Sequence, residues 1–148
     1  MRTVGLSYNP KVPRWQTLVD EIVVWLKARG VATWMYATEN KPPHECLEAS
    51  DLLITLGGDG TILRAVPFTA PLDIPLLGIN LGRVGFLTEC MPDAWPETLE
   101  KIMAGEGQVE ERIMLQVLLS RGGNIIHRDA GLNDGVVSRG GQARIVHL

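Results

Sequence analysis

Apolar runs alternate with stretches of helical periodicity along the chain as far as about residue 104. The runs are short, rich in Leu, Ile and Val, and bounded by Gly, Pro or Asn, which is typical of buried strands. Strands are expected at 3–8, 31–36, 52–56 and 75–80. Helices are expected at 13–29, 45–49 and 93–104, with another beginning in 62–66 and a proline-rich loop at 67–75. This alternation predicts a parallel α/β sheet with helices on both faces, a three-layer Rossmann-like domain.

The pattern changes near residue 108, after which no helical periodicity is visible. Strand-like segments follow at 112–120, 125–129, 136–138 and 143–148, separated by hairpin signals at 121–124 and 139–142. We therefore predict an α/β domain at 1–107 and the beginning of an all-β domain at 108–148. About 40 residues are marginal for an independent sheet, so this second domain is expected to be incomplete.

The segment with the strongest chemical signal is Gly57-Gly58-Asp59-Gly60-Thr61, which follows a buried strand directly. In α/β sheets, ligands bind beyond the carboxyl ends of the strands. Glycines there allow backbone N–H groups to approach a phosphate, and a helix opened by Thr61 adds a favourable field for an anion. A carboxylate in such a loop suits a metal ion or a hydroxyl proton. The structural alternative is a tight turn, since Asp-Gly is a common turn dipeptide.

A second strand runs into a second glycine loop at Asn80–Thr88. Two such loops in one sheet can converge on one ligand, and Asn80 offers both a donor and an acceptor to a ribose or phosphate. Phe86 offers a flat face to a base, although packing in the core is the favoured expectation for a phenylalanine. The chain has neither the GxxxxGK[ST] phosphate loop nor a complete GxGxxG, which disfavours a P-loop protein and an ordinary Rossmann dehydrogenase.

A third segment, Asn133-Asp134-Gly135, is by itself a hairpin turn signal. Its functional alternative is an Asn/Asp pair that binds sugar hydroxyls, because a carboxylate accepts such hydrogen bonds and an amide both accepts and donates. The histidines at 44, 127 and 147 are isolated and match no metal-site spacing, and the four tryptophans are expected in the core.

The amino-acid composition further limits the classes of protein to which the chain could belong. With 45% apolar and 21% charged residues, the chain has the balance of a globular protein, and its net charge of −3 does not favour nucleic acid. The two cysteines lie far apart, no signal-peptide core is present, and no apolar run approaches a membrane span. A cytoplasmic protein with no membrane partner is therefore expected.

Taken in order, the three segments resemble NAD kinases of the ATP or polyphosphate type. GGDGT alone is shared with diacylglycerol and sphingosine kinases, but Asn80-Leu81-Gly82-Arg83-Val84-Gly85-Phe86-Leu87-Thr88 is more specific, and the GTxND-like segment of those lipid kinases is absent. The resemblance covers essentially the whole chain. It implies transfer of the γ-phosphoryl group of ATP, or of a polyphosphate phosphoryl group, to the adenosine 2′-hydroxyl of NAD, with Mg²⁺ or another divalent metal. It also implies a homo-oligomer in the full-length protein.

The resemblance further implies individual roles. Asp59 would act at the acceptor hydroxyl and the metal, and Gly57, Gly58 and Gly60 would line the phosphates, with Thr61 supporting the loop. Asn80 belongs to the same nucleotide-binding set. Phe86 would lie near the adenine side of the dinucleotide, and Asn133 and Asp134 would hold ribose hydroxyls.

Two departures from the family pattern stand out. Gly135 occupies a position where the family usually has a branched apolar residue, and the second glycine- and Ser/Thr-rich segment of the family is absent. The chain therefore resembles the first half or so of such an enzyme. Two alternatives remain open: a non-catalytic nucleotide-binding fragment or partner subunit, and a lipid kinase of the diacylglycerol type.

Overall fold

The computed structural model describes residues 1–82, 85–88 and 90–136 of the 148-residue chain. The chain divides into two compact units, Met1–Val109 and a second that begins at Glu110. Among the described residues, no helix combines the length and the apolar character needed to cross a membrane.

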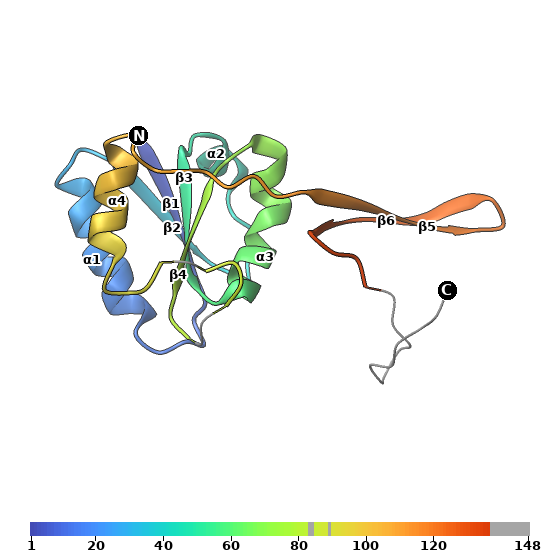
Figure 1. The fold of residues 1–148 in the computed structure, drawn as a ribbon, viewed down its shortest axis with the longest axis horizontal. Coiled ribbons are helices and arrows are strands. Elements are labelled where there is room, and N and C mark those ends of the chain that lie inside the picture. The colour runs from blue at the N-terminus through green and yellow to red at the C-terminus, as the bar shows by residue number, and fades with distance from the viewer. Residues whose placement is uncertain (83–84, 89, 137–148) are drawn as a thin grey trace. The chain divides into compact units, whose positions relative to one another are not determined.

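The first unit is built on a four-stranded parallel sheet with the order β2-β1-β3-β4 (Figure 1). Its strands are β1 (Thr3–Tyr8), β2 (Ala32–Ala37), β3 (Leu52–Gly57) and β4 (Leu76–Asn80). The chain passes from β1 to β2 on one side and then crosses to β3 on the other, so the order reverses between β1 and β3. Ligands of open α/β sheets bind at such a switch point, beyond the carboxyl ends of the strands.

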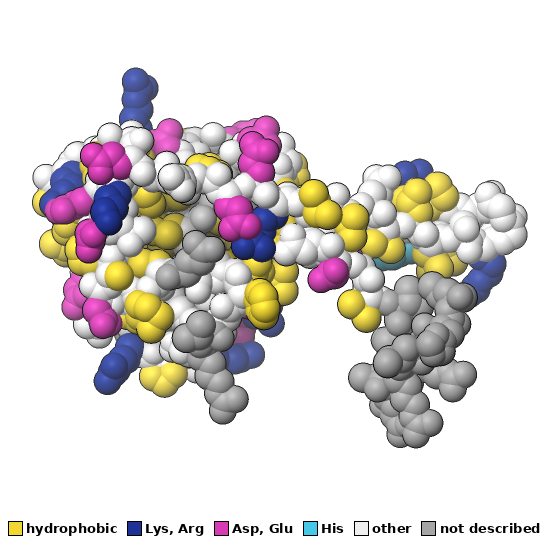
Figure 2. Space-filling model, in the orientation of Figure 1, with side chains coloured by type: hydrophobic (Ala, Val, Ile, Leu, Met, Phe, Trp, Pro, Cys, Tyr) yellow, Lys and Arg dark blue, Asp and Glu magenta, His cyan; other side chains and the backbone are white. Residues whose placement is uncertain are grey.

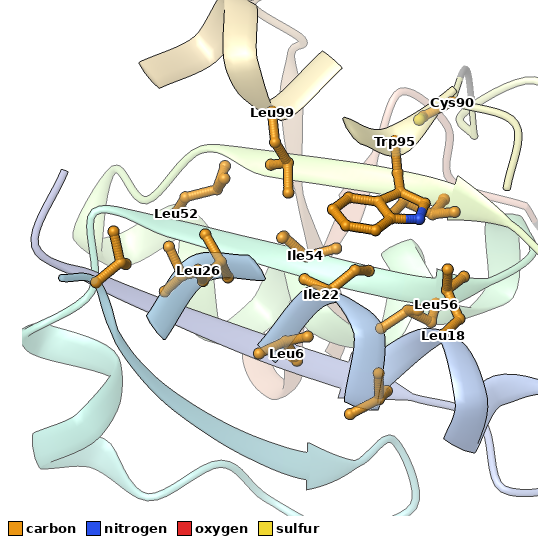
Figure 3. Packing of buried hydrophobic residues seen from close by; sticks show 14 residues of the cluster. Leu6, Leu18, Ile22, Leu26, Leu52, Ile54, Leu56, Cys90, Trp95 and Leu99 are labelled. Atoms are coloured by element: carbon orange, nitrogen blue, oxygen red, sulfur yellow. The ribbon is translucent and has the colours of Figure 1, made fainter. Parts of the chain in front are cut away.

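Helices cover both faces of this sheet, which confirms the predicted α/β class (Figure 1). On one face lie α1 (Trp15–Lys27) and α4 (Trp95–Met103), and on the other lie α2 (His44–Glu48), α3 (Asp59–Thr69) and the 3₁₀ turn η1 (Ala70–Leu72). Figure 3 shows the larger core, in which apolar side chains of α1 and α4 pack on those of β1 and β3. Of the four tryptophans, Trp95 is buried in this core and the other three are half-buried.

Helix α3 is longer than the sequence suggested. It begins at Asp59 rather than within 62–66, and it continues through Pro67 to Thr69, where a loop was expected. A proline inside a helix displaces the carbonyl four residues earlier, here that of Leu63. Helix α3 nevertheless continues for two residues beyond Pro67, and Leu63 itself is exposed at the surface.

The second unit contains an antiparallel hairpin of β5 (Met114–Arg121) and β6 (Asn124–Leu132). Its turn residues Gly122 and Gly123 both have positive φ, 57° and 80°, as the turn signal in the sequence required. Apolar side chains of both strands are exposed (Figure 2). Of the two further strands expected, one begins at Val136, which is not in a strand, and the remainder of both lies outside the described residues.

Candidate functional site

The first glycine loop lies at the carboxyl end of β3, beside the switch point. Asn9, which follows β1, donates its N–H to the carbonyl of Leu56 at 3.2 Å, so the ends of β1 and β3 are tied together. The strand ends at Gly57, Gly58 is the N-cap, and Asp59 is the first residue of α3. The Asp59 carboxylate therefore lies at the positive end of the helix dipole.

The three glycines of this loop differ in what surrounds them. A Cβ on Gly57 would overlap the buried Thr61 hydroxyl, so the packing of Thr61 requires glycine there. A Cβ on Gly58 or Gly60 would meet no atom within 4 Å. The φ of Gly58, −110°, is also open to any residue. Within the described part of the chain, no neighbouring atom requires glycine at 58 or 60. Open space next to a glycine backbone is what we expect where a ligand approaches that backbone.

The second loop returns along β4 to the same end of the sheet. Asn80 is buried at the end of β4, and its Oδ1 accepts the Gly82 N–H at 2.8 Å. The Asn80 N–H donates to the carbonyl of Cys90 at 2.8 Å, and the Leu81 N–H donates to the carbonyl of Gly57 at 3.0 Å. The two loops are thus joined directly, as expected for two segments that converge on one ligand.

The strongest link between the loops is the Asp59 carboxylate. Its Oδ2 accepts the N–H of Phe86 at 2.7 Å. Its Oδ1 accepts the N–H of Leu87 at 3.0 Å, the N–H of Thr88 at 3.2 Å and the Thr88 hydroxyl at 3.3 Å. Successive backbone N–H groups that surround an anion form a nest. We call this set of contacts between Asp59 and residues 86–88 the Asp59 clasp.

The Asp59 clasp explains a further glycine. A Cβ on Gly85 would overlap the Asp59 carboxylate, so only glycine allows the loop to close on it. Sequence reasoning assigned no role to Gly85 or Thr88 individually. The available signal was their place in the second glycine loop, but nothing local in the sequence pairs that loop with Asp59.

The environment of Asp59 keeps it ionised. Desolvation raises the pKa of this carboxyl, but the hydrogen bonds from Phe86, Leu87 and Thr88 together outweigh it, and the pKa lies below its ordinary value. At neutral pH Asp59 is therefore an anion, suited to accept a hydroxyl hydrogen or to bind a cation.

The expectation that Phe86 packs in the core is wrong. Its ring is 93% exposed, whereas its N–H is held by Asp59. Because the backbone of the loop is fixed against the carboxylate, the side chain projects outward and its flat face is open to solvent. A base could therefore stack on it.

Asn133 and Asp134 belong to the second unit. They follow β6, where Asn133 has a left-handed backbone, with φ 64°. Its N–H donates to the carbonyl of Ile113 at 3.1 Å, and the Asp134 N–H donates to the carbonyl of Leu132 at 2.7 Å. The first unit thus brings together the predicted site residues at 57–61, 80 and 86, while the pair at 133–134 stays a separate prediction.

Within the described ranges, no group of three or more His, Cys, Asp or Glu side chains could hold a metal ion. His44 lies 3.4 Å from Glu48, and His127 lies 3.8 Å from Asp129, both at the surface. His147 lies outside the described residues.

A parallel sheet with helices on both faces, and with glycine loops and one clasped carboxylate at its switch point, defines a three-layer α/β domain with a candidate ligand site at that switch point. The sequence profile of the ATP-NAD kinase N-terminal domain matches residues 27–107. The chain belongs to this NAD kinase family, which confirms the resemblance found in the sequence.

Individual relatives of the chain support its membership of this family. The NAD kinase of Nitratidesulfovibrio vulgaris is 39% identical over 150 residues, which cover 100% of this chain and 50% of that protein. The NAD kinase of Geobacter sulfurreducens is 35% identical over 156 residues, covering 100% and 55%. The chain thus spans about half the length of the curated relatives it matches.

Among solved structures, yeast NADH kinase complexed with NADH matches with a TM-score of 0.69 at 19% identity. The match covers 89% of this chain and 46% of that one. At this level of identity the likeness concerns the fold, and it confirms the predicted α/β architecture.

Proposed function

We propose that this chain provides the phosphate-binding domain of an enzyme that phosphorylates the adenosine 2′-hydroxyl of NAD to give NADP. Family membership supports the reaction, and the position of Asp59 is the observation that carries the proposal. An ionised carboxylate at the switch point, between two glycine loops, is placed where an acceptor hydroxyl and a phosphoryl group can meet.

In this reaction, the 2′-oxygen of NAD forms a bond to the γ-phosphorus of ATP while the bond from that phosphorus to the β–γ bridging oxygen breaks. ADP leaves, and the hydroxyl proton passes to a base or to water. Phosphoryl transfer depends mainly on positioning and electrostatic stabilisation. Because its pKa is lowered, Asp59 is a weak base, so we assign it the task of accepting the hydroxyl hydrogen and orienting the oxygen.

We assign the other predicted site residues to binding of the nucleotides. The open backbone at Gly58 and Gly60 would approach the phosphates, while Gly57 and Thr61 hold the loop in shape. The exposed Phe86 ring would stack on adenine, and Asn80 would support the second loop beside the nucleotide. Asn133 and Asp134 would hold ribose hydroxyls.

A divalent metal such as Mg²⁺ fits this site with Asp59 as the one carboxylate that we assign to it. Mg²⁺ is usually held by one or two carboxylates together with substrate phosphates and water. Because the one free site of the Asp59 carboxylate is assigned to the acceptor hydroxyl, Asp59 would hold the metal through a bound water, and the phosphates would supply the direct ligands. The metal would neutralise charge on the phosphates. ATP is the donor we propose, with polyphosphate as the alternative. Homo-oligomerisation and a cytoplasmic location stay predictions.

A non-catalytic nucleotide-binding fragment or partner subunit has no specific observation in its favour. A lipid kinase of the diacylglycerol type has no specific observation in its favour.

The test is NADP formation. The complete polypeptide encoded by the gene is incubated with NAD, ATP and Mg²⁺, and NADP is measured with an NADP-specific dehydrogenase. We expect turnover with NAD and none with diacylglycerol. In parallel, the 148-residue chain is titrated with NAD and ATP by calorimetry. Turnover by this chain alone would exclude the binding-only function, and a complete polypeptide that binds NAD without forming NADP would exclude the kinase.

A further inference from the structure

The Asp59 clasp gives the second glycine loop a task other than contact with a nucleotide. Three successive N–H groups, which could bind a phosphate, are already used by a carboxylate of the same chain. The loop at 86–88 is therefore a holder for Asp59, and phosphate binding falls to the first loop.

The four contacts are divided unequally between the two carboxylate oxygens. Oδ1 accepts hydrogen bonds from the Leu87 N–H, the Thr88 N–H and the Thr88 hydroxyl. Oδ2 accepts one, from the Phe86 N–H. Each carboxylate oxygen has about two lone-pair sites, so the three donors leave no free site on Oδ1, and the Thr88 hydroxyl is the most distant of them at 3.3 Å. Oδ2 retains one site for a further donor.

We infer that Thr88 is a positioning residue for phosphoryl transfer: it fixes the Asp59 carboxylate so that Oδ2 faces the acceptor hydroxyl. This inference rests on the proposed function. Thr88 is the only one of the three residues at 86–88 that contributes a side-chain donor, and its two contacts to Oδ1 set the rotation of the carboxylate about its Cβ–Cγ bond.

The surroundings of Thr88 make it a rigid support. The residue is buried at 5% exposure. A Cβ on Gly78 would lie 3.1 Å from its methyl group and 3.2 Å from its Cα, so Thr88 packs closely over the glycine of β4. With the methyl group placed against the sheet, the hydroxyl is held toward Asp59. Thr88 belongs to a loop, but its packing against β4 fixes its side chain, and a side chain fixed by packing holds a site more accurately than a free one.

The test must separate positioning from a merely structural role. Thr88→Val keeps the shape and removes the hydroxyl, whereas Thr88→Ser keeps the hydroxyl and removes the methyl group. Thr17→Val, on the exposed side of α1, is the matched control. In the complete polypeptide, we expect Thr88→Val to lower kcat about tenfold, because a loss of this size corresponds to one hydrogen bond to a charged group. The KM for NAD should change less than about twofold.

We further expect Thr88→Ser to retain kcat within about threefold of the unsubstituted protein, because serine keeps the hydroxyl, which is the part of the Thr88 side chain that contacts the carboxylate. Thr17→Val should change nothing. Equal losses of kcat in Thr88→Val and Thr88→Ser, or an effect confined to KM, would show that Thr88 only supports the loop and would overturn the inference.

A second readout does not depend on activity. In the ¹⁵N-labelled chain, Asp59→Ala should accelerate hydrogen exchange of the amides of Phe86, Leu87 and Thr88 by at least about tenfold, because it removes their acceptor, and should leave the amides of β3 unchanged. Unchanged exchange at 86–88 would refute the clasp, whatever the activity. Clasp-dependent exchange in a polypeptide that forms no NADP would instead refute the proposed function alone.

Discussion

Substitution of Gly85 by alanine tests the Asp59 clasp through stability. A Cβ at this position would overlap the Cγ and both oxygens of Asp59, so either the carboxylate or the loop must move. A displacement large enough to relieve the overlap breaks or lengthens the hydrogen bonds from residues 86–88.

The expected cost follows from those bonds. A hydrogen bond to a charged group contributes a net ~1.5–3 kcal/mol. Asp59 is only half-buried, so water replaces part of what is lost. We take the total loss to equal one of the hydrogen bonds between Asp59 and residues 86–88. Gly85→Ala should then lower the free energy of unfolding by about 2 kcal/mol.

Gly60→Ala is the matched control. A Cβ there meets no atom within 4 Å, and the residue lies in the first turn of α3. Alanine should therefore leave the free energy of unfolding unchanged or raise it by about 0.5–1 kcal/mol, through helix propensity and the lower entropy of the unfolded chain. If Gly60 approaches phosphate, the same substitution should weaken nucleotide binding.

The assay is urea unfolding followed by tryptophan fluorescence. All four tryptophans lie in the first unit, so the signal reports the domain that contains the clasp. The reasoning would be refuted by a Gly85→Ala variant as stable as Gly60→Ala.

Three further outcomes are expected. Asp51 accepts hydrogen bonds from the N–H groups of Arg2 and Thr3, and these bonds lower the pKa of its carboxyl. The ionised carboxylate therefore stabilises the fold at any pH above the pKa of Asp in the unfolded chain, which is about 4. This stabilisation is lost as the pH falls through the lower pKa of Asp51 in the folded chain. Urea midpoints between pH 7 and pH 2 should therefore fall less for Asp51→Asn than for the unsubstituted chain, and equal falls would contradict this. Leu99→Ala, in the fully buried core contact of α4 with the sheet, should cost about 2–5 kcal/mol in the same unfolding assay. Phe86→Ala should leave the unfolding midpoint unchanged while weakening NAD binding measured by calorimetry, because the ring contributes no buried surface; a destabilised variant would contradict that exposure.

Much of the α/β unit could be predicted from the sequence because its strands are short, continuous apolar runs. Residues 52–56, for example, are buried on both faces and bounded by glycine, which is the signature of a central parallel strand. The hairpin turn at Gly122-Gly123 was equally local, since the positive φ it needs is a property of glycine.

The features that were missed depend on contacts between distant residues. The clasp joins Asp59 to amides 27 to 29 residues later, so no local pattern contains it. The outward position of Phe86 follows from the same contacts. The continuation of α3 through Pro67 was missed for a different reason, because proline disfavours the interior of a helix.

The central claim is that Asp59 acts at the acceptor hydroxyl of NAD. It is tested most directly by NADP formation in the complete polypeptide with Asp59→Asn, compared with Asp73→Asn at a turn outside the site. We expect a loss of about 10²-fold for Asp59→Asn, because the charge that orients the acceptor hydroxyl is lost, and none for Asp73→Asn. Undiminished NADP formation by the Asp59→Asn variant would contradict it.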